Sequence, residues 1–166
     1  MFVREVTRED AAPLARLLKD VDASNVMLYH PGERKARPDG LEKHIQNIQH
    51  TPHSRWFVAV NHNEALCGYV FMMGNDLRRT KHRAFVVIGV DERARGQGVG
   101  SQLMQHAETW AESAGVHRLE LTTLVHNHAA ISLYSSLGYE QEGIRYASLC
   151  IDDVYHDELY FYKLLT

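Results

Sequence analysis

A glycine-rich turn between an apolar segment and an amphipathic segment most constrains what this chain can fold into. Residues 95–100 read Arg-Gly-Gln-Gly-Val-Gly and follow the apolar run Ala84–Val90. Three glycines let the backbone approach whatever lies against the turn, because no Cβ stands in the way. The start of the following helix leaves N–H groups without partners and carries the positive end of the helix dipole. The turn is therefore predicted to bind a phosphate or pyrophosphate, with a purely structural tight turn as the alternative.

Length and composition indicate one soluble domain spanning residues 1–166, with a net charge of −3. This charge gives no electrostatic case for nucleic acid or an anionic membrane as a partner. No apolar run is long enough to span a bilayer, and the N-terminus carries charge too early for a secretory leader. The two cysteines form no disulfide framework and no metal motif, so a cytoplasmic location is expected. The sequence has eleven histidines but no His-Glu-x-x-His motif, and we expect no metal site.

Hydrophobic periodicity predicts the element order β-α-α-β-β-β-α-β-α-β-β, a mixed α/β domain. The first helix follows Thr7, the second holds Leu41 to Ile48, the third follows the glycine turn and the fourth begins at Asn127. The predicted strands cover Phe2–Val6, Trp56–Val60, Ala65–Met73, Ala84–Val90, Arg118–Val125, Tyr139–Ile144 and Glu158–Leu164.

Three further expectations concern how these elements begin and pair. The segment Asn25–Gly40 is expected to be irregular, with a chain break at Pro38-Asp39-Gly40. Ala84–Val90 is continuous enough to be a central strand buried on both faces. It should run parallel to Arg118–Val125, because a helix joins the two strands through a right-handed crossover.

Two nucleotide-binding motifs do not match the glycine turn. No Lys-Ser or Lys-Thr pair follows the last glycine, which excludes a Walker A loop. The glycines alternate rather than follow the Gly-x-Gly-x-x-Gly spacing of a dinucleotide-binding fold.

Two blocks of sequence resemble the GNAT superfamily, the acyl-CoA-dependent N-acetyltransferases. The first is Arg-x-x-Gly-x-Gly at a strand-to-helix junction. The second, Asn127–Glu140, is similar to the family stretch Asn-x-x-Ala-x-x-Leu-Tyr-x-x-x-Gly-Tyr/Phe, and order and separation also agree. The resemblance implies the GNAT fold, an α/β (α+β) domain. Its mixed, mostly antiparallel sheet has about seven strands, a central splayed parallel pair and flanking helices. It also implies acetyl transfer from acetyl-CoA directly to a small-molecule, protein or peptide amine.

The resemblance assigns the cofactor site to the turn and its neighbours. The phosphates would lie on Arg95, Gly96, Gln97, Gly98, Val99, Gly100 and Ser101. A bulky residue at Gly98 or Gly100 should hinder the ligand. Pantetheine would pair with the backbone of Ile88 and Val90 as an added strand. Gly89 suits a bulge there or is merely tolerated, and Asn127 caps a helix, contacts pantetheine, or does both.

Tyr134 matches the tyrosine that many family members use as general acid. A thiol has a pKa of about 8.5 and tyrosine about 10, so a proton can pass to the leaving thiolate. The alternative is a core tyrosine with a satisfied hydroxyl.

The general base has no clear assignment, because the strand segment Phe85–Ile88 lacks the glutamate that many relatives carry there. Glu33, His126, His128 or water could take the proton. The resemblance also predicts an acceptor cleft flanked by residues 25–40 and 149–157, with Tyr29 and Glu33 binding the acceptor. The basic residues 78–83 are expected to form a solvated loop, or to contact an acidic partner or the CoA 3′-phosphate.

Two other functions and one assembly remain open from the sequence. The missing glutamate supports a non-catalytic acyl-CoA-binding or sensing domain of the same fold. A structural domain whose turn holds no ligand is a third possibility. The apolar segment Leu159–Tyr162 can support a homodimer, although burial in the core explains it as well.

Overall fold

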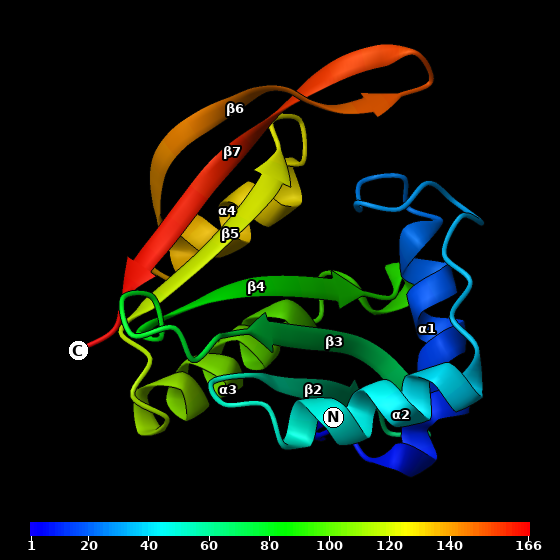
Figure 1. Ribbon diagram of the computed structural model, residues 1–166. Helices are drawn as coiled ribbons and strands as arrows, with labels where there is room; N and C mark the ends of the chain where they lie inside the picture. Colours follow the sequence, from blue (N-terminus) through cyan, green and yellow to red (C-terminus); the bar gives the residue numbers. More distant parts are fainter.

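The computed structural model describes residues 1–166 and consists of a twisted seven-stranded sheet with helices on both faces (Figure 1). The strand order is β1-β2-β3-β4-β5-β7-β6, and only β4 and β5 run parallel. This arrangement confirms the predicted mixed, mostly antiparallel sheet. The strands are β1 (Phe2–Glu5), β2 (Arg55–Val60), β3 (Leu66–Met73), β4 (Arg83–Val90), β5 (Arg118–Leu124), β6 (Glu140–Ile151) and β7 (Val154–Leu164).

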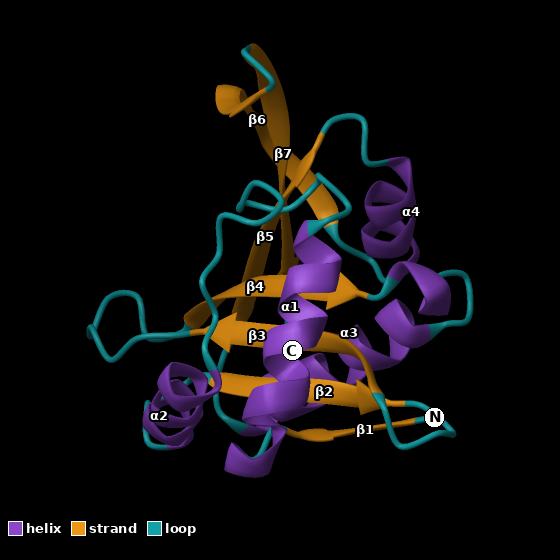
Figure 2. Ribbon diagram, turned by 90° about the vertical axis from the view of Figure 1, so that its right-hand side faces the viewer, coloured by secondary structure: helices purple, strands orange, loops and turns teal.

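Two helices cover each face of the sheet (Figure 2). Because side chains alternate along a strand, neighbouring residues of β2 and β3 enter different cores. Val58 and Tyr69 belong to the core under α1 and α2, whereas Phe57 and Val70 belong to the core under α3 and α4. The helices are α1 (Ala11–Asp22), α2 (Pro38–Gln49), α3 (Val99–Ser113) and α4 (His128–Ser136), and two 3₁₀ turns, η1 (Arg8–Asp10) and η2 (Glu92–Ala94), precede α1 and α3.

The second helix begins earlier than its sequence predicts. Pro38-Asp39-Gly40 forms the first turn of α2, so the expected break at this position is wrong. Proline suits the first helical position, because the N–H it lacks would have no partner there and its φ is already helical. Asp39 also lies where the helix dipole favours an acidic side chain.

The last hairpin is longer than the alternation of its residues indicates. β6 continues past Ile144 to Ile151, with a register shift between Arg145 and Leu149. Ala147 lies in this bulge with φ of +48°, and its N–H donates to a carboxylate oxygen of Asp157 at 2.8 Å. The bulge interrupts the two-residue period, which is why the sequence pattern ended the strand too early.

β4 and β5 pair only at their first residues and then diverge (Figure 1). The paired residues are Arg83–Phe85 with Arg118–Glu120, and no pairing follows. The second half of β4 therefore has a neighbour on one edge only, and Val87, Ile88 and Val90 are partly exposed. Burial on both faces is therefore wrong for this half of the strand, whereas its central place in the sheet is confirmed.

Gly89 lets Tyr69 and α1 pack closely over β4. Gly89 and Tyr69 are direct partners in the β3–β4 pairing. The register of this pairing does not shift at Gly89, so Gly89 marks no bulge. A Cβ at position 89 would lie 2.6 Å from Cε1 of Tyr69 and 2.7 Å from Cγ1 of Val21. Only glycine fits here without displacing the ring or the helix.

Replacing Gly89 with alanine should therefore destabilise the fold by about 1–3 kcal/mol, the usual cost of overpacking a core. Urea denaturation of Gly89→Ala measures this loss. Gly40→Ala is the matched control, since position 40 is helical and has open space; it should be neutral or stabilising. Equal stability of Gly89→Ala and the wild type would contradict the packing argument.

Candidate active site

The turn that precedes α3 is shaped by one capping carboxylate and two left-handed glycines. Asp91 accepts hydrogen bonds from the backbone N–H of Arg93 at 2.9 Å and from its guanidinium at 2.8 and 3.1 Å. The Arg93 guanidinium holds the pKa of the Asp91 carboxyl below its usual range. Gly96 and Gly98 then adopt φ of +72° and +79°, conformations that favour glycine, and α3 begins at Val99.

The backbone amides of this turn have no partner within the protein. None of the backbone N–H groups from Gly96 to Ser101 donates a hydrogen bond. The first helical hydrogen bond of α3 is that from the Gln102 N–H to the Gly98 carbonyl, at 3.1 Å. A Cβ at Gly96 or Gly98 would meet no atom within 4 Å, so open space lies beside these two glycines. Arg95 is exposed and belongs to no ion pair. The turn therefore offers several oriented donors and a free cation to an anion.

Gly100 has a packing role that the sequence does not reveal. A Cβ there would lie 2.9 Å from Cδ2 of Leu133 on α4. A larger residue at 100 would therefore press on Leu133, and its effect on a ligand stays a prediction. The missing side chain instead lets the first turn of α3 contact α4.

The free edge of β4 presents backbone groups to the gap beside β5. The Asp91 N–H donates to the Cys67 carbonyl on β3, and hydrogen-bonded residues alternate along an antiparallel ladder. The N–H and C=O groups of Ile88 and Val90 therefore point to the other edge, where β5 has moved away. An extended ligand could pair with them as an added strand.

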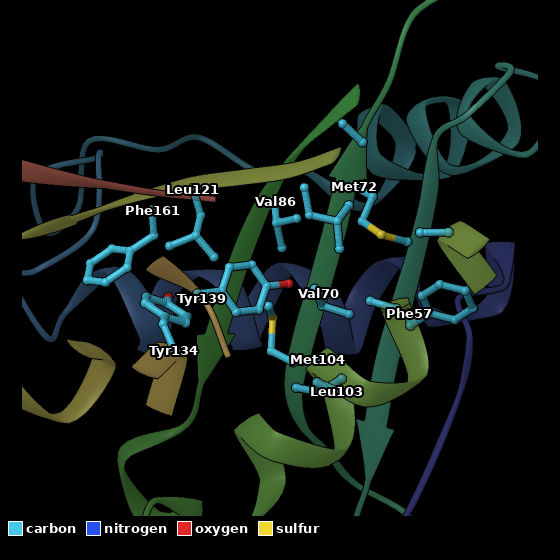
Figure 3. Close-up of a cluster of buried hydrophobic side chains, with 14 of the residues drawn as sticks. Phe57, Val70, Met72, Val86, Leu103, Met104, Leu121, Tyr134, Tyr139 and Phe161 are labelled. Carbon is cyan, nitrogen blue, oxygen red and sulfur yellow. The ribbon is translucent and has the colours of Figure 1, made fainter. Parts of the chain in front are cut away.

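Tyr134 lies on α4, in the core beside this gap, and is 5% exposed. Its ring centroid is 6.1 Å from that of Tyr139 and 5.8 Å from that of Phe161 (Figure 3). Its hydroxyl makes no hydrogen bond with a protein group. Burial, with a smaller contribution from Tyr69, raises the pKa of Tyr134 well above 10. The hydroxyl is therefore protonated at physiological pH and available as a donor.

Asn127 caps α4 as one of its two predicted roles requires. Its side-chain oxygen accepts a hydrogen bond from the Ala130 N–H at 3.3 Å. The amide nitrogen of the side chain has no partner in the protein, so a contact with pantetheine stays a prediction.

Tyr29 and Glu33 lie in the loop between α1 and α2, and each side chain has a partner within the protein. Glu33 accepts a hydrogen bond from the His30 N–H at 2.9 Å, within its own loop. The Arg34 guanidinium lies over the ring of Tyr29, with its Cζ 4.3 Å from the ring centroid. The same guanidinium donates two hydrogen bonds, at 2.8 and 3.1 Å, to the buried Asp22 carboxylate. Their role in acceptor binding stays a prediction.

Asp22 and Arg34 were not found by sequence reasoning, because no pattern links a helix end to a loop residue twelve positions away. The enclosed Tyr69 hydroxyl lies near this ion pair and has no hydrogen-bond partner. Burial, partly offset by Arg34, raises the pKa of Tyr69 to about 12.

The basic residues 78–83 lie at the start of β4, whose first residue is Arg83, and therefore at the opposite end of the strand from the glycine turn. A role for this loop in binding the CoA 3′-phosphate therefore stays a prediction, as does the solvated loop. None of the helices combines the length and apolar character that crossing a membrane requires. No group of three or more His, Cys, Asp or Glu side chains is arranged to hold a metal ion.

Comparison with known proteins shows the family. Residues 23–139 match the model of the acetyltransferase (GNAT) family, and the chain belongs to this family. It is 34% identical over 97 residues to the N-alpha-acetyltransferase RimI of Mycobacterium tuberculosis, covering 57% of this chain and 58% of that protein. The chain spans less than two thirds of the length of the curated relatives that it matches first.

Solved structures show the same fold at low sequence identity. An acetyltransferase of the GNAT family from Streptococcus pneumoniae superposes with a TM-score of 0.94 at 24% identity, covering 99% of both chains. A phosphinothricin acetyltransferase from Sinorhizobium meliloti, solved in complex with acetyl-CoA, gives a TM-score of 0.86 at 17% identity, covering 98% of this chain and 87% of that one. These likenesses confirm the predicted GNAT fold.

Gly98→Ala should weaken acetyl-CoA binding about tenfold, because the strained turn would no longer aim its amides together. Calorimetric titration with acetyl-CoA measures the change. Gly115→Ala is the matched control, since Gly115 has a similar φ of +77° and equally open space but ends α3. Both variants should lose similar stability, and equal losses of affinity would argue against a site at the turn.

Proposed function

We propose that this member of the GNAT family transfers the acetyl group of acetyl-CoA directly to a primary amine in a ternary complex. The observation that carries the proposal is the run of unpartnered amides from Gly96 to Ser101 beside the free edge of β4. These amides, with Arg95, would bind the diphosphate of CoA. Ile88 and Val90 would pair with the pantetheine arm, and Asn127 would donate to it from its side-chain nitrogen.

The Val90 amide would also polarise the thioester carbonyl. An N–H at the strand edge can stabilise the oxyanion that forms when an amine attacks. Tyr134 would donate its proton to the sulfur as the C–S bond breaks. Holding both reactants in the gap would supply much of the rate. The acetyl-CoA complex of the phosphinothricin acetyltransferase of the same fold supports this choice of donor.

The acceptor would enter between the α1–α2 loop and the β6–β7 hairpin, on the α1 side of the gap. Tyr29 and Glu33 lie in that loop, and rotation of Arg34 would free the Tyr29 ring to contact an ammonium group. The name of the RimI relative supports an amine as the acceptor. The experiment is CoA release with a panel of polyamines, amino acids, aminoglycosides and peptides with free N-termini. Release no faster than without protein, across the whole panel, would overturn the proposal.

Tyr134→Phe should lower kcat about 10²-fold and leave the Kd for acetyl-CoA unchanged, because it removes only a proton donor. The rate of CoA release at saturating acetyl-CoA and saturating concentrations of the best amine of the panel measures kcat. Tyr139→Phe is the matched control, because the Tyr139 hydroxyl is also buried without a partner but is not part of the proposed chemistry. The family block itself allows phenylalanine at this position. If both variants lost kcat equally, Tyr134 would not be the acid.

A non-catalytic acyl-CoA-binding domain is the second candidate function, favoured by the absence of an acid on β4. It requires tight acetyl-CoA binding without turnover, so calorimetry and the amine panel together separate the two functions.

We further propose a cytoplasmic location and a homodimer, with β6 as the contacting edge. Phe161 is buried and its strand lies between β5 and β6, so the segment Leu159–Tyr162 has no free edge of its own. β6 ends the sheet, and Tyr146 is 75% exposed on it. Light scattering in solution tests the dimer, and fractionation of cells tests the location.

A further inference from the structure

The proposed reaction needs a group that removes a proton from the acceptor nitrogen, and β4 does not provide one. Its residues from Ala84 to Val90 include no acid or base. Glu33 is held by the amide of His30 in its own loop. The following inference rests on the proposed function and concerns the opposite wall of the gap, formed by β5 and β7.

Two imidazoles meet at the end of β5. The ring centroids of His126 and His156 are 5.2 Å apart, and the ring planes are inclined by 61°. His126 is exposed just beyond β5, and His156 is half-buried on β7. The contact is edge-to-face, so His156 supports one side of the His126 ring and leaves the remainder open.

The strand register places this pair beside the mouth of the gap. Phe85 of β4 pairs with Glu120 of β5, and five residues further along each strand are Val90 and Val125. His126 is the next residue after Val125, so it lies just beyond the level of the β4 edge that would hold the thioester. The two strands have diverged at this level, which leaves room for substrates between them.

The alternation of β7 places the pair on the acceptor side of the sheet. Phe161 packs against Tyr134 in the core under α3 and α4. Residues two apart share a face, so His156 and Glu158 lie on the opposite face, which is the face covered by α1. Tyr134 and the imidazoles therefore approach the gap from opposite sides, as an acid and a base for a direct transfer must.

The charged groups near the pair are already engaged. The Asp157 carboxylate accepts a hydrogen bond from the Ala147 N–H at 2.8 Å. Glu158 contacts Ser148 and the Arg145 guanidinium of β6. On the α4 side, His128 is exposed as the first residue of the helix. Neither histidine of the pair takes part in an ion pair, so both nitrogens of the His126 ring are free to exchange a proton.

We propose that His126 is the general base of the reaction and that His156 positions it. The His126 imidazole takes one proton from the bound ammonium group, and the amine nitrogen freed in this way then forms the bond to the thioester carbon and passes its second proton to water. The C–S bond breaks, and the sulfur receives the proton of Tyr134. His126 then releases its proton to water, and the Tyr134 phenolate regains one from water. The products are the N-acetyl amide and CoA with a free thiol, with no redox change.

The test uses n-butylamine, whose only polar group is the amine, together with the best amine of the panel. His126→Gln should lower kcat/KM for n-butylamine about 10²-fold at pH 7. The acidic limb of the pH profile, which protonation of a general base produces, should disappear. The deficit should shrink toward pH 10, because the amine then loses its proton in solution, with a pKa of about 10.4. The Kd for acetyl-CoA, measured by calorimetry, should stay that of the wild type.

Two further variants separate the roles. His128→Gln is the matched control and should keep wild-type kinetics, since His128 is exposed at the start of α4 and its ring is not part of the edge-to-face pair. His156→Phe keeps an aromatic ring beneath His126 and should retain most activity, whereas His156→Ala should lose it. A loss in His156→Phe as large as in His126→Gln would overturn the assigned roles.

The outcome also distinguishes failure of the inference from failure of the function. If the wild type acetylates n-butylamine and His126→Gln matches its kcat/KM and pH profile, His126 is not the base. If the wild type releases no CoA with any amine, the proposed function is wrong and the base with it.

Discussion

The early divergence of β4 and β5 is the constraint on which the rest of the site depends. Parallel strands joined by a helix would normally pair along their whole length, yet here pairing ends at Phe85 and Glu120. The cost is a row of unsatisfied backbone groups on β4, in the middle of a sheet rather than at its edge. A protein retains such groups where a ligand satisfies them, and the unpartnered amides before α3 lie at the end of this same strand.

The divergence also sorts the site into two sides. α3 and α4 carry the glycine turn and Tyr134 on one face, whereas α1, its following loop and the imidazoles of His126 and His156 occupy the other. A donor and an acceptor can then enter from different directions and meet only where the sheet is open. The close packing of Tyr69 over Gly89 keeps the acceptor side filled up to this opening.

Much of the fold could be predicted from the sequence because its signals are local. The helix-ending glycines Gly115 and Gly138 have φ of +77° and +84°, as their positions after apolar periodic segments indicate. The Asn127 cap and the order of elements follow equally local rules. The bulge at Ala147 could not be predicted from such local rules, because the hydrogen bond that stabilises it is accepted by the Asp157 carboxylate, ten residues away.

The acceptor side was less predictable than the cofactor side for the same physical reason. The glycine turn presents backbone groups whose geometry a short motif specifies, whereas Arg34 and Asp22 come together only through tertiary structure. The sequence made His126 a candidate for the general base. It carried no signal for His156, whose ring on β7 contacts that of His126 beyond the end of β5. Which of the eleven histidines have their rings in contact is decided by the tertiary structure, which a single sequence does not show.

The contact between Gly100 and Leu133 links the two ends of the cofactor-facing side. Leu133 immediately precedes Tyr134, so the space beside Gly100 is occupied by the residue next to the one that carries the phenol on α4. A side chain at position 100 would therefore push on the helix that carries the hydroxyl. The proposed anchor for one end of a long, flexible molecule and the phenol proposed to act at its other end therefore lie on helices that pack against each other, so the fold itself sets the distance between them.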